Sequence, residues 1–234
     1  MSITNNVARA KSDYDEVYEA GKKSQYDEFW DAYQSLATTR NYKYGFAGRG
    51  WGYKTWYPKF DLHPTAMANC FAEMNTIIPF SMTERLKECG VVFDSSECTS
   101  SFDMAFYSCA FSELPTIDMT KTNSARLAFR SNVLEKVTVI LPEASFAWNE
   151  TFRDCTQLTD VVFIGELKSN GMSFSHSKLL TKASIESVIN SLSTATSGLS
   201  VTFSQTAVNN AFTTAEWNAL IATRANWTIN LLDS

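Results

Sequence analysis

The stretch that decides the fold spans residues 151–163 and reads "TFRDCTQLTDVVF". Its apolar positions recur at steps of three and then two residues, at Phe152, Cys155, Leu158, Val161 and Phe163. A step of two is typical of a strand with one buried face. We expect the first three of these side chains to face the interior. Arg153 and Asp154, which fall between them, are expected to face solvent.

The same pattern recurs along the chain. Its copies open with Phe71, Phe106, Phe129, Phe152 and Phe174, and a weaker copy opens with Phe46. The last four openings are 23, 23 and 22 residues apart. Apolar residues follow each opening after five or six, eight or nine, and eleven positions, as at Leu179, Ala183 and Ile185 after Phe174 and at Ile140 after Phe129. A period near 23 predicts a solenoid of stacked coils, in which each coil buries its apolar side against its neighbours.

Short β-branched tracts supply the strands of this stack. "VTVIL" (137–141), "VVFI" (161–164) and "VVFD" (91–94) have the length and residue types of strands. "SMTERLKECG" (81–90) is expected to be an inserted short helix that ends at Gly90, with Ser81 or Thr83 as its N-cap.

The two ends depart from the pattern, as the caps of a stack must. Residues 12–36 have helical spacing with a weak point at Gly21, and residues 184–192 also have helical spacing. A strand over 199–204, a helix capped at Thr213 or Thr214 with Glu216 near its start, and a strand over 227–232 complete the chain. We therefore divide it into an N-terminal helical cap (1–42), a solenoid (43–186) and a C-terminal α/β cap (187–234).

The polar and charged residues argue against several classes of function. A formal net charge of −5 and scattered basic residues disfavour a nucleic-acid partner. The sequence lacks an apolar run of about 18 residues, so no membrane span is expected. The polar N-terminus shows no secretion signal. Asp61, Asp94 and Asp118 follow strand-like tracts, where capping a turn is favoured over binding a cation.

Enzymatic chemistry finds little support in the sequence. Five cysteines without a C-x-x-C pair, and two histidines without a partner ligand, predict reduced thiols and no metal or cofactor. A catalytic Cys155 would need His176, about one coil away, as its base. Cys155 instead holds the same place as Cys109, three residues after a phenylalanine, and Asn132 and Ser177 fill that place elsewhere. We expect a structural thiol, no catalytic residue and no enzyme.

These residues resemble a known family. "TFRDCTQLTDVVF" is similar to the BspA-type leucine-rich repeat of bacteria, F-x-x-C-x-x-L-x-x-I-x-I, and the likeness extends over about residues 44–186. The resemblance implies an α/β leucine-rich-repeat solenoid with stacked short parallel strands. The two ends resemble repeat proteins of phages and prophages of gut Firmicutes, which often accompany tail or baseplate genes. That implies a virion-associated protein that recognises a protein or glycan on a host surface.

Two surfaces are candidates for that contact. The segment "RGWGYKTWYPKF" (49–60) gathers Arg49, Trp51, Tyr53, Trp56 and Tyr57 among glycines, although these rings could instead pack beneath the N-terminal helix. The outward side of the sheet, near Thr116, Asp118, Glu135 and Thr138, is the second candidate.

Three other functions stay open at this point. The chain could be a purely structural virion subunit that packs against other virion proteins or forms a homo-oligomer. It could be a bacterial cell-surface or secreted adhesin module. The remaining alternative is a cysteine hydrolase built on Cys155.

Overall fold

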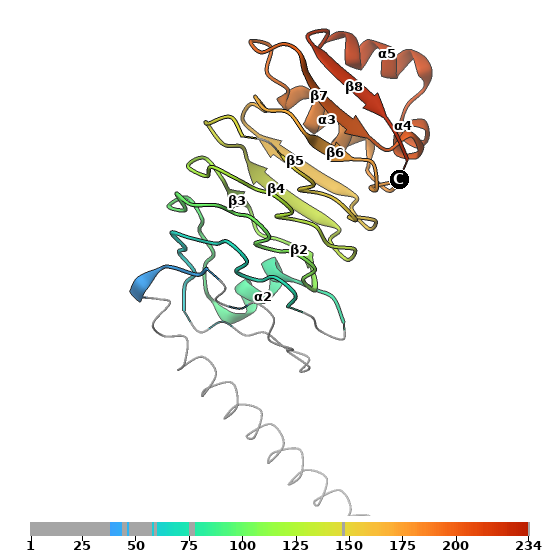
Figure 1. The fold of residues 1–234 in the computed structure, drawn as a ribbon. Coiled ribbons are helices and arrows are strands. Elements are labelled where there is room, and N and C mark those ends of the chain that lie inside the picture. Colours follow the sequence, from blue (N-terminus) through green and yellow to red (C-terminus); the bar gives the residue numbers. More distant parts are fainter. Residues whose placement is uncertain are drawn as a thin grey trace, which may run out of the picture.

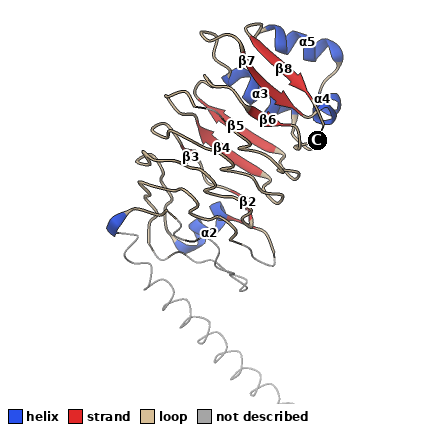
Figure 2. Cartoon of the chain, in the orientation of Figure 1, coloured by secondary structure: helices blue, strands red, loops and turns tan. Residues whose placement is uncertain are grey.

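The computed structural model describes residues 38–43, 46, 58, 60–74, 78–146 and 148–233. In this part the chain is a mixed α/β protein whose strands pair in parallel in two sheets, as predicted for the class (Figures 1 and 2). Among the described residues, no helix is long and apolar enough to cross a membrane. The helix expected over residues 12–36 lies outside the described residues.

The first sheet holds the strands of the middle of the chain. They are β1 (Phe80–Ser81), β2 (Phe111–Glu113), β3 (Ile117–Asp118), β4 (Lys136–Ile140) and β5 (Asp160–Ile164). β4 pairs with β5 over its whole length, from Lys136 opposite Asp160 to Ile140 opposite Ile164. β2 and β3 both pair with β4 and are separated by Pro115, which cannot donate to a strand ladder. The expected strands over 137–141 and 161–164 are thereby confirmed.

The second sheet lies at the C-terminal end. It consists of β6 (Met172–Phe174), β7 (Leu199–Phe203) and β8 (Trp227–Leu231), again paired in parallel. Figure 1 shows the strands of both sheets stacked in order from the end near α2 to the end that carries the C-terminus.

A ladder of buried phenylalanines runs through the interior. Neighbouring ring centroids lie 5.0, 5.3, 5.9, 5.2, 4.8 and 5.7 Å apart along the series Phe46, Phe71, Phe106, Phe129, Phe152, Phe174 and Phe203. All seven side chains are buried. The six phenylalanines identified from the sequence thus lie side by side, and Phe203 extends the series. We call the segment that begins at each of these phenylalanines a layer.

Backbone hydrogen bonds join the layers from Phe46 to Phe152 beside the ladder. Phe106 N–H donates to the Ala128 carbonyl, and Phe129 N–H donates to the Thr151 carbonyl. Left-handed residues flank several of the phenylalanines two positions away on either side, as Glu150 (φ 55°) and Asp154 (φ 59°) flank Phe152. These non-glycine residues adopt a conformation that L-residues disfavour, so the pairing between layers must hold them there.

Helix α2 (Met82–Cys89) interrupts one layer, as the sequence predicted. Ser81 accepts a hydrogen bond from Glu84 N–H as N-cap, and Gly90 ends the helix in the left-handed conformation. The strand expected over 91–94 is reduced to a single bridge between Leu62 and Phe93. Toward β3, the contact is made by the Ser95 hydroxyl and not by the backbone. This hydroxyl accepts from the Asp118 N–H and donates to the Asp118 carbonyl.

The first sheet ends where helix α3 (Lys182–Ser191) covers β5. The α3 hydroxyls of Ser184 and Ser187 accept the backbone N–H groups of Val161 and Phe163 at 2.9 and 3.0 Å. Ser184 also donates to the Thr159 carbonyl at 2.9 Å. Side chains of a helix therefore take the place of the next strand. This helix begins two residues before the predicted range.

The C-terminal elements follow the sequence closely. α5 (Thr214–Ala222) begins with a reciprocal capping box between Thr213 and Glu216, as predicted, and β7 and β8 occupy the expected strands. Helix α4 (Gln205–Ala211) was not predicted. Only Ala207 and Val208 of this helix are buried, so its sequence shows no clear apolar face.

Four inward positions were placed wrongly. Leu179 is 52% exposed and Leu180 is buried in its place, while Ala183 is exposed near the start of α3. Val139, not the half-buried Ile140, points into the core. Asn132 is exposed and Ser131 is buried in its stead. The layer of Phe129 has no left-handed residue two positions after its phenylalanine, unlike those of Phe106 and Phe152.

Candidate functional site

The aromatic segment proposed from the sequence is not placed by the structure. Arg49, Trp51, Tyr53, Trp56 and Tyr57 all lie outside the described residues. The site that the structure does place is polar and lies beside the phenylalanine ladder.

Cys155 lies beneath this surface and has a packing role. Its side chain is fully buried, and its thiol donates to the Phe129 carbonyl at 3.0 Å. Ser177 of the next layer donates in turn to the Cys155 carbonyl at 3.1 Å. Burial raises the pKa of Cys155 to about 12, so the thiol stays protonated at neutral pH.

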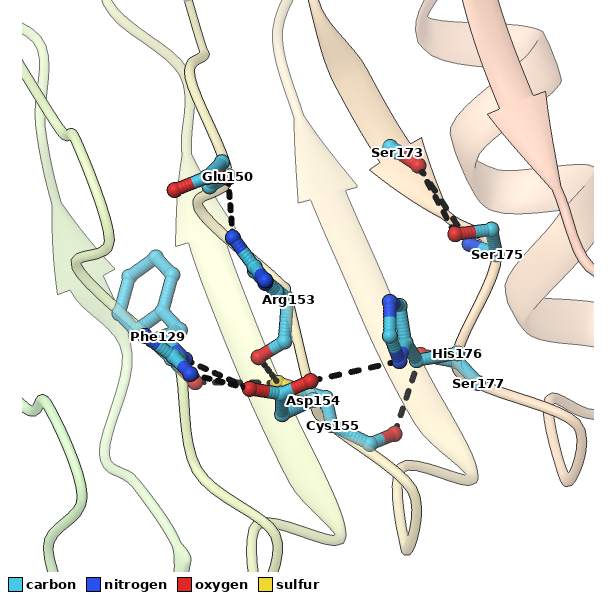
Figure 3. Close-up of polar contacts among 10 residues, drawn as sticks. Phe129, Glu150, Arg153, Asp154, Cys155, Ser173, Ser175, His176 and Ser177 are labelled. Carbon is cyan, nitrogen blue, oxygen red and sulfur yellow. Dashed lines mark hydrogen bonds and ion pairs between the residues drawn. The ribbon is translucent and has the colours of Figure 1, made fainter. Parts of the chain in front are cut away.

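Four side chains from successive layers form a continuous polar row, which we define as Tyr107, Arg130, Asp154 and His176. The Arg130 guanidinium lies 5.3 Å from the centre of the Tyr107 ring. Its Nε and Nη2 atoms lie 2.7 and 2.6 Å from Oδ2 of Asp154. The other oxygen of Asp154 lies 3.3 Å from Nδ1 of His176 (Figure 3). Asp154 therefore does not simply face solvent, as the sequence predicted, but joins two neighbouring layers.

The backbone beside the ladder places these side chains in register. Each follows a buried phenylalanine by one or two residues, and backbone hydrogen bonds join the layers of Phe106, Phe129 and Phe152 at that point. The left-handed conformation of Asp154 turns the chain immediately after Phe152. The hydrogen bond that Arg130 donates to Asp154 raises the pKa of Arg130, which keeps the guanidinium charged.

Two shallow pockets adjoin the polar row. The first, of about 290 Å³, is lined by Tyr107, Ser108, Arg130, Ser131, Asn132 and Asp154. The second, of about 420 Å³, is lined by Asn149, Glu150, Arg153, Gly171, Ser173, Ser175 and His176. Asp154 lines the first pocket and His176 lines the second, and these two side chains contact each other. The two pockets are therefore neighbours on one surface.

The second pocket has a fixed rim. Arg153 donates to Glu150 across one turn, and Ser173 lies 3.4 Å from Ser175 between hydroxyl oxygens (Figure 3). Gly171 adopts φ +90°, and a Cβ atom at this position would lie 3.5 Å from the Trp148 backbone nitrogen. A side chain here would be strained and would project beside Trp148 and Asn149.

The outward side of the first sheet was the second predicted surface. Thr116 and Glu135 are exposed there, and Thr138 lies opposite Val162 on β5. Val162 and Ile164 are 45% and 47% exposed, so this side is more apolar than expected.

Two of the three aspartates near the strand ends act as turn caps, as predicted. Asp94 and Asp118 accept hydrogen bonds from backbone N–H groups two residues further along. Asp61 instead accepts from Val92 N–H in the next layer. Within the described ranges, no group of three or more His, Cys, Asp or Glu side chains is placed to hold a metal ion.

The sequence contained a signal for the polar row that our reading missed. Tyr107, Arg130, Asp154 and His176 follow four consecutive phenylalanines of the pattern at nearly constant offset. Comparing the residues one and two positions after each phenylalanine across the copies, rather than along one copy, would have brought Arg130 and Asp154 together.

Comparison with known proteins gives no relative for this chain. No family model, no curated protein and no solved structure matches it.

Proposed function

We propose that this chain is a non-enzymatic repeat protein of the leucine-rich-repeat solenoid type, which acts by binding. In this proposal residues 43–186 form the solenoid and the two end segments cap it. Its working surface is built from side chains that successive layers present one or two residues after their phenylalanine.

The phenylalanine ladder is the observation that carries this proposal. Seven rings stack from Phe46 to Phe203, and parallel pairing joins segments that are 22 to 24 residues apart in the middle of the chain. Layers that bury their apolar side only against neighbours leave their outer positions free to vary. Such positions can specify a partner without a cost to the core.

Binding is supported over catalysis by the chemistry of the polar row. Its charged groups lie against one another, since Asp154 accepts from Arg130 and also lies 3.3 Å from Nδ1 of His176. The thiol nearest to them is buried and protonated, so it lacks the thiolate that a cysteine hydrolase needs.

The biological setting of the proposal rests on the resemblance to phage and prophage repeat proteins. It assigns the chain to a virion, as a tail-associated component that contacts a protein or glycan on a bacterial surface or packs against other virion proteins. The experiment is to image particles from the producing strain with a gold-labelled antibody to this chain. Label at one end of the particles supports the proposal. Label that stays in the soluble fraction, with clean particles, would refute the virion setting.

A further inference from the structure

We propose that the two pockets beside the polar row form one binding site for a neutral saccharide chain. This inference rests on the proposed binding function and names the class of ligand. It uses described residues only, and it is independent of the aromatic segment 49–60.

The second pocket has the size and lining for a sugar unit. Its volume of about 420 Å³ lies within the usual range of small-molecule sites, about 300 to 1,000 Å³. Its lining offers an amide, a carboxylate, a guanidinium, two hydroxyls and an imidazole. Planar groups such as those of Asn149, Glu150 and Arg153 carry paired donors or acceptors, which match the paired hydroxyl groups of a pyranose ring.

The charge balance favours a neutral ligand. Glu150 is paired with Arg153, and Asp154 is paired with Arg130, so the two fixed ion pairs cancel. No cationic side chain of these pairs is left uncompensated to attract a phosphate or a carboxylate. Each carboxylate still has oxygen lone pairs that can accept from a hydroxyl group, because an ionised carboxylate offers about four acceptor positions.

The arrangement of the pockets favours a chain over a single sugar. The two pockets meet at the contact between Asp154 and His176, and each is built from two or three successive layers. Ser131 and Asn132 continue the polar lining on the far side of that contact. A linear saccharide can lie along the row and occupy both pockets, with the Asp154–His176 contact beneath the linkage between two units.

A peptide fits this surface less well. Apolar side chains need an apolar surface to bury, and Tyr107, the one aromatic residue in the lining of the two pockets, has the Arg130 guanidinium over its ring. Hydroxyl-rich ligands lose less by binding to a polar, partly hydrated surface.

The test is a glycan array that presents neutral hexose and N-acetylhexosamine saccharides of increasing length beside acidic ones, probed with the full chain. We expect retention on neutral saccharides, with a Kd that falls between one unit and two. Glu150→Gln and Asn149→Ala should each weaken binding about tenfold, the loss expected for one hydrogen bond to an anionic or amide group. Arg126→Met is the control, since Arg126 is exposed and lines neither pocket, while its neighbour Leu127 donates to the carbonyl of Asn149 in the second pocket.

The outcomes separate this inference from the proposed function. Binding to acidic saccharides alone, no retention on any neutral saccharide, or equal retention of all variants would overturn the saccharide site. Antibody label on particles together with any of those results would leave the virion role standing. Unchanged circular dichroism of the variants ensures that lost binding reports on the pocket and not on folding.

Discussion

At the scale of single residues, one inward position explains much of the sequence. Cys155, Ser131 and Ser177 all direct a small donor toward a carbonyl of the preceding layer, at Phe129, Cys109 and Cys155 respectively. A buried carbonyl without a partner is costly, so a small side chain that can donate stabilises these three layers. Serine and cysteine both supply this donor.

This role predicts how Cys155 reacts. Because burial raises the pKa of its thiol to about 12, an iodoacetamide probe at mildly alkaline pH should leave Cys155 unmodified in the folded protein. Cys89, which is only partly buried, serves as the internal comparison and should react faster. Peptide mass analysis measures both sites. Rapid native modification of Cys155 would contradict the buried-donor role.

The same role predicts the effect of substitution. Cys155→Ser keeps a donor to the Phe129 carbonyl and should change the free energy of unfolding by less than about 1 kcal/mol. Cys155→Val fills the space but leaves that carbonyl unpaired, which should cost about 1 to 3 kcal/mol. Urea denaturation of the two variants gives the comparison. Equal stability of both would show that the hydrogen bond contributes nothing.

At the scale of elements, serine hydroxyls replace strand pairing where the sheet is interrupted. Ser95 does so opposite Asp118, and Ser184 does so opposite Val161. Both serines are buried and both donate and accept, which is what a strand residue would do through its backbone. In this way α3 closes the first sheet and leaves no open edge beside β5.

Removing this hydroxyl should therefore weaken the join between α3 and β5. We expect Ser184→Ala to lower the free energy of unfolding by about 1 to 3 kcal/mol, because Val161 N–H is left buried without an acceptor. Ser191→Ala on the same helix is the control. The Ser191 hydroxyl donates to the Val188 carbonyl of its own helix, so its loss should cost less. The idea fails if the control variant is the less stable of the two.

The C-terminal cap should respond to acid. Asp233 accepts from the hydroxyls of Ser204 and Thr206 at the start of α4, and these bonds lower its pKa to about 2. Lys182 and the capping box likewise lower the pKa of Glu216 to about 2. Unfolded carboxyls titrate near 3.9 to 4.3, so this stabilisation is complete above about pH 4 and is lost as the pH falls toward 2.

An acid titration of stability checks this expectation. The loss below about pH 4 should be smaller in the Asp233→Asn variant, which has no carboxyl to protonate. Because both groups are exposed, added salt should weaken the Lys182–Glu216 part of the effect. A pH profile of Asp233→Asn identical to that of the natural chain would contradict the role of Asp233.

Element by element, the success of the sequence reading depended on local signals. The α2 and α5 boundaries were predictable because Ser81, Gly90 and Thr213 cap their own helices. The prediction of a strand over 91–94 was wrong because neighbouring residues take its hydrogen bonds. Val91 N–H donates to Leu86 of α2, and the Ser95 hydroxyl makes the contact with Asp118. Leu179 and Leu180 could not be told apart, since the choice depends on where α3 begins.

At the scale of the whole molecule, the repeat of the buried phenylalanines could be predicted from the sequence, and the polar row could not. Equal spacing of phenylalanines indicated which side chains would stack, and the structure places them 4.8 to 5.9 Å apart. The polar row depends instead on side chains that meet across layers, such as Arg130 and Asp154, which are 24 residues apart. The sequence of one layer alone does not indicate an ion pair between two layers.

The central claim is that the chain is a stack of interchangeable layers. Deleting residues 129–151, one complete interval from Phe129 to the residue before Phe152, tests it most directly. The account predicts a folded protein that unfolds cooperatively. In small-angle scattering it should be shorter by about one strand spacing, roughly 5 Å. Deleting only residues 129–139 breaks the register and should abolish folding. If the complete-layer deletion unfolds the protein as thoroughly as the partial one, the layers are not equivalent and the solenoid reading is wrong.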